Sequence, residues 1–203
     1  MTSNELFEIL AVAGRLKTTT RHCYTARDRK ESVAEHSWRV ALWGMLLTGT
    51  PEFSDVDINK VVRMALIHDL GEAFTGDVPS FEKTDAETDK EKDLFFSWVD
   101  GFSEPQRSEW LGLLREMEAL QTPEARLYKA LDKMEAVLSH DESDIATWLP
   151  LEYQLQTEYG WENVRFSEFL TELRSKLDAI THEKIASAEK TTTDAEEKKG
   201  VAP

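Results

Sequence analysis

Histidine and carboxylate side chains lie close together in a segment that otherwise has the pattern of a buried helix. The stretch ALIHDLGEAFTGD, residues 65–77, contains His68, Asp69, Glu72 and Asp77. The residues before it, DINKVVRMAL, have the apolar spacing of an amphipathic helix. Burying charged groups is costly unless they are paired with other charges or bound to a metal. The pattern therefore raises the hypothesis that His68 and Asp69 hold a ligand.

A second histidine, His36, lies on the apolar face of another predicted helix. It is in line with three apolar residues at steps of four, three and four positions, namely Val40, Trp43 and Leu47. One histidine on an apolar face is usually a hydrogen-bonded core residue. Two such histidines beside an aspartate favour a shared ligand, and imidazole with carboxylate suits a transition metal.

A further inward acid would complete such a metal site, and Asp132 is the candidate. It lies in the middle of the predicted helix YKALDKMEAVL, between Leu131 and Met134. Periodicity leaves a second interpretation open, in which Asp132 is exposed and paired with Lys129.

These residues together resemble the H…HD…D signature of the HD-domain metal-dependent phosphohydrolases. The signature is formed here by His36, His68, Asp69 and Asp132. The strings ESVAEHSWRVAL, LIHDLGEAFTGDVP and KALDKMEAVL are similar to the branch of YfbR-like 5'-deoxynucleotidases, over residues 5–175. The resemblance implies an all-α, single-domain HD-type helical bundle and hydrolysis of a nucleotide phosphate ester. It also implies one divalent metal ion, of undetermined identity among Mn, Co, Mg, Ni, Fe and Zn, with these four residues as ligands.

The number of metal ions also follows from the histidines. A dinuclear HD site, as in the di-iron oxygenases of this superfamily, needs extra histidines between Asp69 and Asp132, and the sequence has none there. His140 and His182 come too late in the chain for that role. We therefore expect a mononuclear site.

The resemblance assigns further roles beyond the metal ligands. Glu72 matches the catalytic acid of the HDxxE motif, and Asp77 matches the acid after Thr-Gly that approaches the substrate. Arg21 matches a nucleotide-binding arginine, and His22 stands where the bacterial enzyme has a tryptophan that helps exclude a ribose 2'-hydroxyl. Strict deoxyribose selectivity is therefore not implied. Glu72 as a partner of a ligand histidine, and Asp77 as a cap of the turn before Pro79, are the structural alternatives.

The chemistry of such a site places a proton-transfer group beside the metal. An ion held by two imidazoles and two carboxylates can keep positions for water and a phosphate oxygen, and it lowers the pKa of that water towards ~7. Glu72 comes one helical turn after His68. We expect Glu72 to act there as a general base, or as the acid that protonates the leaving oxygen.

The basic residues are concentrated in one early stretch. Between positions 15 and 30 the only acid is Asp28, against Arg15, Lys17, Arg21, Arg27, Arg29 and Lys30. On a chain with a net charge of −15, this stretch suggests a small anionic ligand, and a solvated basic loop is the alternative. Because guanidinium groups bind phosphate oxygens bidentately, Arg21, with Arg15 or Lys17, is expected to receive the phosphate.

Three functions are compatible with these residues. The leading hypothesis is a metal-dependent 5'-nucleotidase that removes phosphate from (deoxy)nucleoside 5'-monophosphates. The alternative within the superfamily is a nucleotide tri- or pyrophosphohydrolase. A third hypothesis, from another class, is a non-catalytic ligand-binding HD protein, against which the intact Glu72 and metal ligands argue.

Helices are expected to position all of these groups. Capping boxes and apolar periodicity predict helices at residues 2–16, 32–47, 57–76, 82–102, 103–120 and 122–141, with a last one from 166. Residues 17–31 have no apolar period and are expected to form a long loop. No β-like alternation persists anywhere, so the fold class is all-α. The HD domain is expected to span residues 1–186, followed by a disordered tail at 187–203.

Composition sets the remaining expectations. A chain of 203 residues suits one domain, and its negative charge argues against nucleic-acid polymers and membrane surfaces as partners. No apolar run reaches the ~18 residues of a membrane span, and the stretch MTSNELFEIL lacks the basic region and the long apolar segment expected of a signal peptide. With Cys23 as the single cysteine, no intrachain disulfide can form. Together with the lack of an apolar span and of signal-peptide features, this suggests a cytoplasmic protein. A homodimer is expected from the family, and the six tryptophans could serve its interface or the core.

Overall fold

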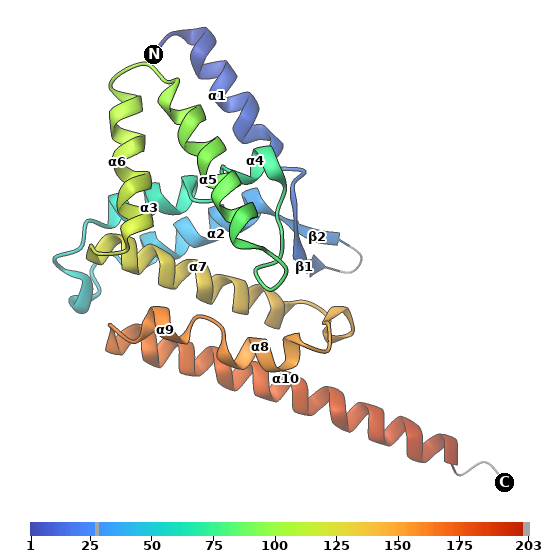
Figure 1. Ribbon diagram of the computed structural model, residues 1–203. Helices are drawn as coiled ribbons and strands as arrows, with labels where there is room; N and C mark the ends of the chain where they lie inside the picture. The colour runs from blue at the N-terminus through green and yellow to red at the C-terminus, as the bar shows by residue number, and fades with distance from the viewer. Residues whose placement is uncertain (27–28, 201–203) are drawn as a thin grey trace.

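The protein is a bundle of helices arranged around one long central helix (Figure 1). The computed structural model describes residues 1–26 and 29–200. In chain order the helices are α1 (Ser3–Arg15), α2 (Val33–Leu46), α3 (Ile58–Ile67), α4 (Glu72–Thr75), α5 (Asp85–Asp100), α6 (Gln106–Ala119), α7 (Pro123–Glu142), α8 (Glu152–Glu158), α9 (Trp161–Val164) and α10 (Glu168–Gly200). Two short 3-10 turns lie at Pro51–Phe53 and Ile145–Thr147. The predicted all-α class is confirmed. Within the described part of the chain, no helix is both long and apolar enough to span a membrane.

Helix α7 is the centre of the bundle. It packs against α2 and α3 on one side and against α9 and α10 on the other (Figure 1). Leu127, Leu131 and Met134 on α7 are fully buried. Because the helix is covered on both sides, its polar residues at neighbouring positions are also drawn inward, and this places Asp132 in the interior.

The predicted helix starts are confirmed by their caps. Thr2 and Ser32 each accept a hydrogen bond from the backbone N–H three residues on, and Glu5 and Glu35 close the two capping boxes. Such caps satisfy backbone donors that the first helical turn leaves without partners. The cap at Ser32 fixes where α2 begins and thereby the position of His36 in its first turn.

The expectation of a long loop at residues 17–31 is wrong. The segment forms an antiparallel hairpin of β1 (Thr20–Ala26) and β2 (Arg29–Ser32), which packs against α7. The pairing is irregular, with register shifts between Thr20 and Tyr24 and again before Ala26. Because a one-residue shift moves side chains to the other face, apolar and polar residues do not alternate, and the strands leave no period-two pattern in the sequence. Arg27 and Asp28 lie outside the described residues.

The helix expected at residues 57–76 is broken into two. Helix α3 ends at Ile67, residues 68–71 form a turn, and α4 begins at Glu72. Backbone bonds in the turn span three residues, as from the Glu72 N–H to the Asp69 carbonyl at 3.0 Å. Helix α5 comes close here, since a Cβ on Gly71 would lie 3.0 Å from Glu91 Cγ. The tighter winding lets the adjacent residues His68 and Asp69 face the same centre, whereas neighbours in a regular helix diverge by about 100°.

The C-terminal boundary has no structural break at residue 186. Helix α10 continues to Gly200, through the segment for which the composition predicts a tail. The predicted division into a domain and a disordered tail stays a prediction, and residues 201–203 lie outside the described residues.

Candidate active site

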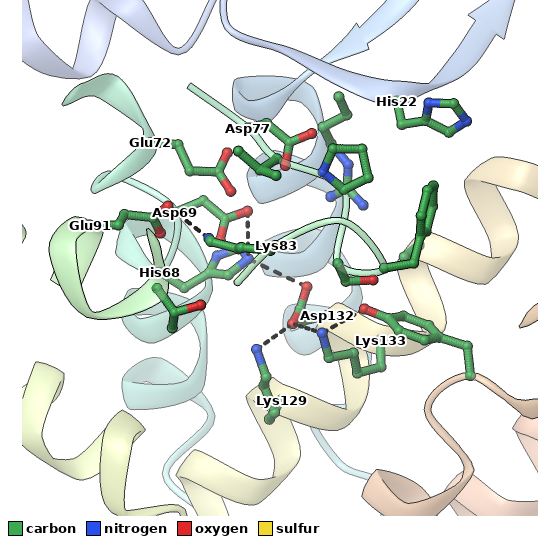
Figure 2. A pocket seen from close by; sticks show the side chains of 18 of the residues that line it. His22, His68, Asp69, Glu72, Asp77, Lys83, Glu91, Lys129, Asp132 and Lys133 are labelled. Atoms are coloured by element: carbon green, nitrogen blue, oxygen red, sulfur yellow. Dashed lines mark hydrogen bonds and ion pairs between the residues drawn. The ribbon is translucent and has the colours of Figure 1, made fainter. Parts of the chain in front are cut away.

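Four predicted ligands from three parts of the chain meet at one point, and we call His36, His68, Asp69 and Asp132 the metal centre. His36 Nε2 lies 3.1 Å from Asp132 Oδ1, 3.6 Å from Asp69 Oδ2 and 3.3 Å from His68 Nε2. His68 Nε2 lies 3.1 Å from Asp69 Oδ2 and 3.5 Å from Asp132 Oδ1. Figure 2 shows His68, Asp69 and Asp132 pointing toward one another.

These spacings fit a divalent cation. Donor atoms about 2.1 Å from an ion lie about 3.0 Å apart at octahedral corners and about 3.4 Å apart at tetrahedral corners. The five distances within the metal centre fall in or close to this range. Two imidazole nitrogens and two carboxylate oxygens are donors that suit a first-row transition metal.

The orientation of both rings supports the same assignment. His68 Nδ1 donates to the Ala65 carbonyl at 2.8 Å, so it carries the proton. His36 Nδ1 is bonded to Glu135, a fully buried carboxylate. Partners of this kind at Nδ1 leave the Nε2 lone pair free to ligate a metal. In the neutral rings the two Nε2 lone pairs face each other beside two carboxylates, an arrangement that requires a positive charge between them.

The pKa values of the metal-centre residues also indicate that the centre favours a positive charge. Burial disfavours a charged ring, but the carboxylates of Asp69 and Asp132 outweigh this effect and raise the pKa of His68 to about 10. Burial would also raise the pKa of Asp132, yet Lys129 and Lys133 hold it well below its ordinary value. The carboxylates thus stay ionised, and the centre attracts either protons or a cation.

Asp132 is buried, so the alternative of an exposed position is wrong, although the pairing with Lys129 that it included is present. Its side chain is buried and faces both histidines through Oδ1, as the metal hypothesis expects. Its other oxygen, Oδ2, accepts a hydrogen bond from Lys129 at 2.8 Å, with Lys133 at 3.8 Å (Figure 2). Oδ1 therefore remains directed at the metal centre while the lysines fix the carboxylate.

The metal centre opens into a cavity of about 410 Å³. Its walls come from β1, the turn after α3, the segment after Gly76, and helices α5 to α8. The predicted site residues that line it are Arg21, His22, His68, Asp69, Glu72, Asp77 and Asp132. A cavity of this size with convergent polar groups suits a small molecule such as a nucleotide.

Glu72 lies in this cavity as a buried acid beside Asp77, with which its side chain shares a hydrogen bond. The residue is 6% exposed, and its Oε2 has no hydrogen-bond partner within the described chain. Burial and the nearby carboxylates of Asp69 and Asp77 raise its pKa. The alternative role as a partner of a ligand histidine finds no support, because His36 and His68 bond Glu135 and the Ala65 carbonyl instead.

Asp77 follows the left-handed Gly76, whose φ of 80° ends α4. The carboxylate lines the same cavity as Glu72 (Figure 2). Burial raises the pKa of Asp77, Arg21 opposes this, and Asp69 adds to it. Asp77 is therefore placed to face a bound molecule.

Arg21 reaches the cavity from β1 and is 15% exposed. Its Nε lies 3.4 Å from Glu31 Oε2, and its Nη1 lies 3.9 Å from Glu135 Oε2. Burial acts against the charged form, but the acids around it, Glu135 foremost, keep its pKa far above the ordinary value. Arg21 is thus a fixed cation that connects the hairpin to the partner of His36.

The other two predicted phosphate-binding residues are not brought to the cavity. The exposed Arg15 donates from Nη1 to the Ala73 carbonyl at 3.4 Å. Lys17 lines a separate shallow hollow beside Trp38. The geometry gives neither residue a part in the candidate active site.

Sequence reasoning missed several residues that the fold brings here. Lys83 and Lys133 line the cavity and supply cations to it, as does Lys129, which the sequence pattern indicates only as a partner of Asp132. Glu135 lies three residues after Asp132 on α7, and extending that inward face by one turn could have identified it. His140 and Glu152 also line the cavity, and no signal in the sequence connects them.

The fold and this set of ligands define the class of protein. The family model described as HD domain matches residues 13–174, so the chain belongs to the HD-domain family, as the signature had predicted. Among curated proteins it is similar to 5'-deoxynucleotidase HDDC2 of Dictyostelium discoideum, with 29% identity over 177 residues, 83% of this chain and 88% of the relative. Human 5'-deoxynucleotidase HDDC2 is 28% identical over 193 residues, covering 92% of this chain and 91% of the relative.

Two further similarities concern chemistry and fold. A dATP triphosphohydrolase of cyanophage S-2L is 35% identical over 113 residues, 53% of this chain and 55% of the relative. A solved structure described as a predicted metal-dependent phosphohydrolase, from Magnetospirillum magnetotacticum, superposes with a TM-score of 0.74 at 26% identity, covering 90% of this chain and 95% of that one. The chain is an HD-domain phosphohydrolase, and the predicted dependence on a divalent metal agrees with these relatives.

Proposed function

We propose that this protein is a metal-dependent 5'-nucleotidase that releases phosphate from (deoxy)nucleoside 5'-monophosphates. The observation that carries the proposal is that the four metal-centre residues converge beside a cavity, which three of them line together with the buried Glu72 carboxylate, whose Oε2 has no hydrogen-bond partner in the described chain. The names of the relatives that match most of the chain support the same reaction. The proposed ion is single at this centre, and its identity is left to experiment.

Each of the cavity residues Glu72, Arg21 and Asp77 has a separate role in the proposed reaction. When bound, a divalent ion supplies Lewis-acid chemistry, withdrawing charge from a phosphate oxygen and acidifying a water. Glu72 is the group placed to transfer a proton, to the leaving oxygen or from the attacking water. Arg21 supplies a guanidinium for the phosphate oxygens, and Asp77 is positioned to accept a hydrogen bond from a sugar hydroxyl.

A second candidate function rests on one relative and on the lysines. The phage relative is named a dATP triphosphohydrolase, and four lysines, Lys83, Lys92, Lys129 and Lys133, line the cavity together with Arg21. Additional cations would suit a longer polyphosphate chain. The products distinguish the two functions, since a monophosphatase releases phosphate, whereas a triphosphohydrolase releases tripolyphosphate.

The test is a product screen on purified protein. Each nucleoside and deoxynucleoside mono- and triphosphate is incubated with Mn, Co, Mg, Ni, Fe or Zn, and phosphate, pyrophosphate and tripolyphosphate are quantified. We expect phosphate from monophosphates, and none from the Asp69→Ala control. Tripolyphosphate from triphosphates alone would favour the second function, and no product from any substrate would refute both in favour of a ligand-binding protein.

A homodimer in the cytoplasm completes the proposal. Exposed apolar side chains follow one face of α2, at positions Trp38, Leu42, Met45 and Leu46. Large exposed apolar patches are typical of association surfaces. Light scattering on the wild type and on Trp38→Glu is expected to give a dimer and a monomer, respectively.

A further inference from the structure

Three side chains at another part of the cavity form a second group of imidazoles and carboxylate. His22 on β1, His140 on α7 and Glu152 on α8 all line the cavity, and we call them the distal cluster. Glu152 Oε1 lies 2.9 Å from His140 Nε2 and 3.2 Å from His22 Nε2. The three donor atoms lie within 4.8 Å of one another, as do those of His36, His68 and Asp69.

The hydrogen bonds of His140 determine which of its nitrogens bears a proton. Its Nδ1 lies 3.1 Å from the Ala136 carbonyl, which can only accept, so Nδ1 carries the hydrogen. In the neutral ring, Nε2 then directs a lone pair at the Glu152 carboxylate. Two electron-rich atoms at 2.9 Å repel each other unless a positive charge lies between them or on the ring.

Glu152 is ionised and almost completely buried, with 1% of its side chain exposed. Burial alone would raise its pKa, but the close contact with His140 and the hydrogen bond from the Leu149 N–H outweigh burial and keep the pKa below the ordinary value. The Leu149 N–H, 2.6 Å away, holds Oε2, so Oε1 is left to face the two histidines. No lysine or arginine in the described chain forms an ion pair with this carboxylate, and a buried charge needs a compensating one.

The histidine rings are held in place by aromatic neighbours. His22 and His140 stack with centroids 6.2 Å apart and an interplanar angle of 28°. Phe81 packs edge-on against His22, and Trp148 packs edge-on against His140. A ligand set is strongest when its rings are orientated before the ion binds.

We propose that the distal cluster is a second divalent-cation site, with His22, His140 and Glu152 as its ligands. Two imidazoles and one carboxylate form a ligand set for Zn²⁺, Co²⁺ or Ni²⁺ that leaves positions open toward the cavity. The Nδ1–carbonyl bond of His140 and the Leu149 N–H bond of Glu152 are the outer contacts that orientate such ligands. This site lies outside the single ion implied by the HD signature and does not rest on the reaction proposed above.

The test counts bound ions without measuring activity. Wild-type protein, Asp69→Ala, His140→Ala and the double variant are dialysed against micromolar free Co²⁺ and analysed for cobalt per chain, with visible absorption of the bound ion. We expect two ions in the wild type, one in each single variant and none in the double variant. Asp69→Ala retains only the distal cluster, so its spectrum reports that site alone.

Two controls keep the outcome decisive. His182→Ala removes an exposed histidine on α10 and should leave two ions bound. If His140→Ala does not fold, Glu152→Gln and His22→Ala test the same site with smaller changes. Equal cobalt content in the wild type and in folded distal-cluster variants, or no cobalt in folded Asp69→Ala, would overturn the proposal and assign the positive charge to protons on the histidines.

Discussion

The metal centre and the distal cluster share one cavity and one chemistry, but their surroundings differ. At the metal centre, Lys129 pairs with Asp132, and Arg39 donates to Glu135 behind His36. At the distal cluster, the described chain brings no lysine or arginine to Glu152, whose partners are two imidazoles and the Leu149 N–H. Side-chain cations thus hold the first set of ligands in place without an ion. The distal cluster has no such cation among the described residues, so its buried carboxylate relies on a bound ion or on protonated histidines for charge compensation. We therefore expect the distal cluster to respond more strongly than the metal centre to added metal and to pH.

The largest expected effect is at the metal centre itself. Asp69→Ala removes a ligand that lies near both histidines, so the ion and the activity should both be lost. Because an ion contributes several kcal/mol of charge stabilisation, we expect activity to fall by on the order of 10³-fold or more. Elemental analysis and phosphate release measure the two losses. A total metal content that does not fall below that of the wild type would show that Asp69 does not help to hold the ion.

Glu72→Gln separates proton transfer from metal binding. Glutamine keeps the size and hydrogen bonding of Glu72 but cannot transfer a proton, so kcat should fall by roughly 10²–10⁴-fold while metal content stays constant. A merely structural Glu72 predicts a normal kcat with a lower melting temperature, and a ligand role predicts metal loss. Measuring all three quantities on this variant distinguishes the roles, and a near-wild-type kcat would contradict ours.

Substitution of Arg21, which lines the cavity from β1, tests the proposed phosphate contact. Arg21→Ala should raise KM for a monophosphate by on the order of 10–100-fold, the loss of a charge-assisted pair. Because alanine also leaves Glu31 and Glu135 without this cation, Arg21→Lys is the matched variant. Lysine keeps the charge but loses the bidentate geometry, so an intermediate KM is expected. An unaltered KM in Arg21→Ala would indicate that the cavity lysines, and not Arg21, bind the phosphate.

The comparison also explains what the sequence could and could not predict. His36 and Asp132 lie on helices, and His68 directly follows one, whose apolar periodicity shows which residues face inward, so the metal centre could be recognised. The distal cluster brings together an irregular hairpin, the far end of α7 and a short helix. No period marks His22 or Glu152, and only tertiary packing brings them to His140.

The helices and strands also divide into those that local sequence patterns predict and those that depend on tertiary packing. Caps predicted the starts of α1 and α2 because capping is local chemistry between residues three apart. The hairpin was missed because its register shifts remove the alternation that would have marked it. The break at residues 68–71 coincides with the close approach of α5 at Gly71, a contact with a residue twenty positions away that local sequence patterns do not show. Long-range packing therefore decided the features that local patterns did not predict.

The smallest expected effect is a change in stability with pH, and it concerns Asp141, the neighbour of His140 on α7. The comparison is with Glu152, a second buried acid that contacts His140. Burial raises the pKa of Asp141 from 3.8 to about 6, against the opposing hydrogen bond from Thr181. A carboxyl with a raised pKa in the folded state contributes most stability below its unfolded pKa, and this stability is lost as pH rises through about 6. Asp141→Asn should therefore raise stability at pH 7 by on the order of 1 kcal/mol and change it little at pH 4.

Glu152→Gln is the matched comparison, because the pKa of Glu152 is lowered rather than raised. Its carboxylate contributes stability above its unfolded pKa, so its loss should lower the melting temperature at pH 7 and matter less as pH falls through the folded pKa. Thermal unfolding of both variants at pH 4 and pH 7 gives the two signs directly. If Asp141→Asn lowered the melting temperature equally at both pH values, the carboxyl would be a simple hydrogen-bond acceptor for Thr181, and the two acids would differ in nothing but their partners.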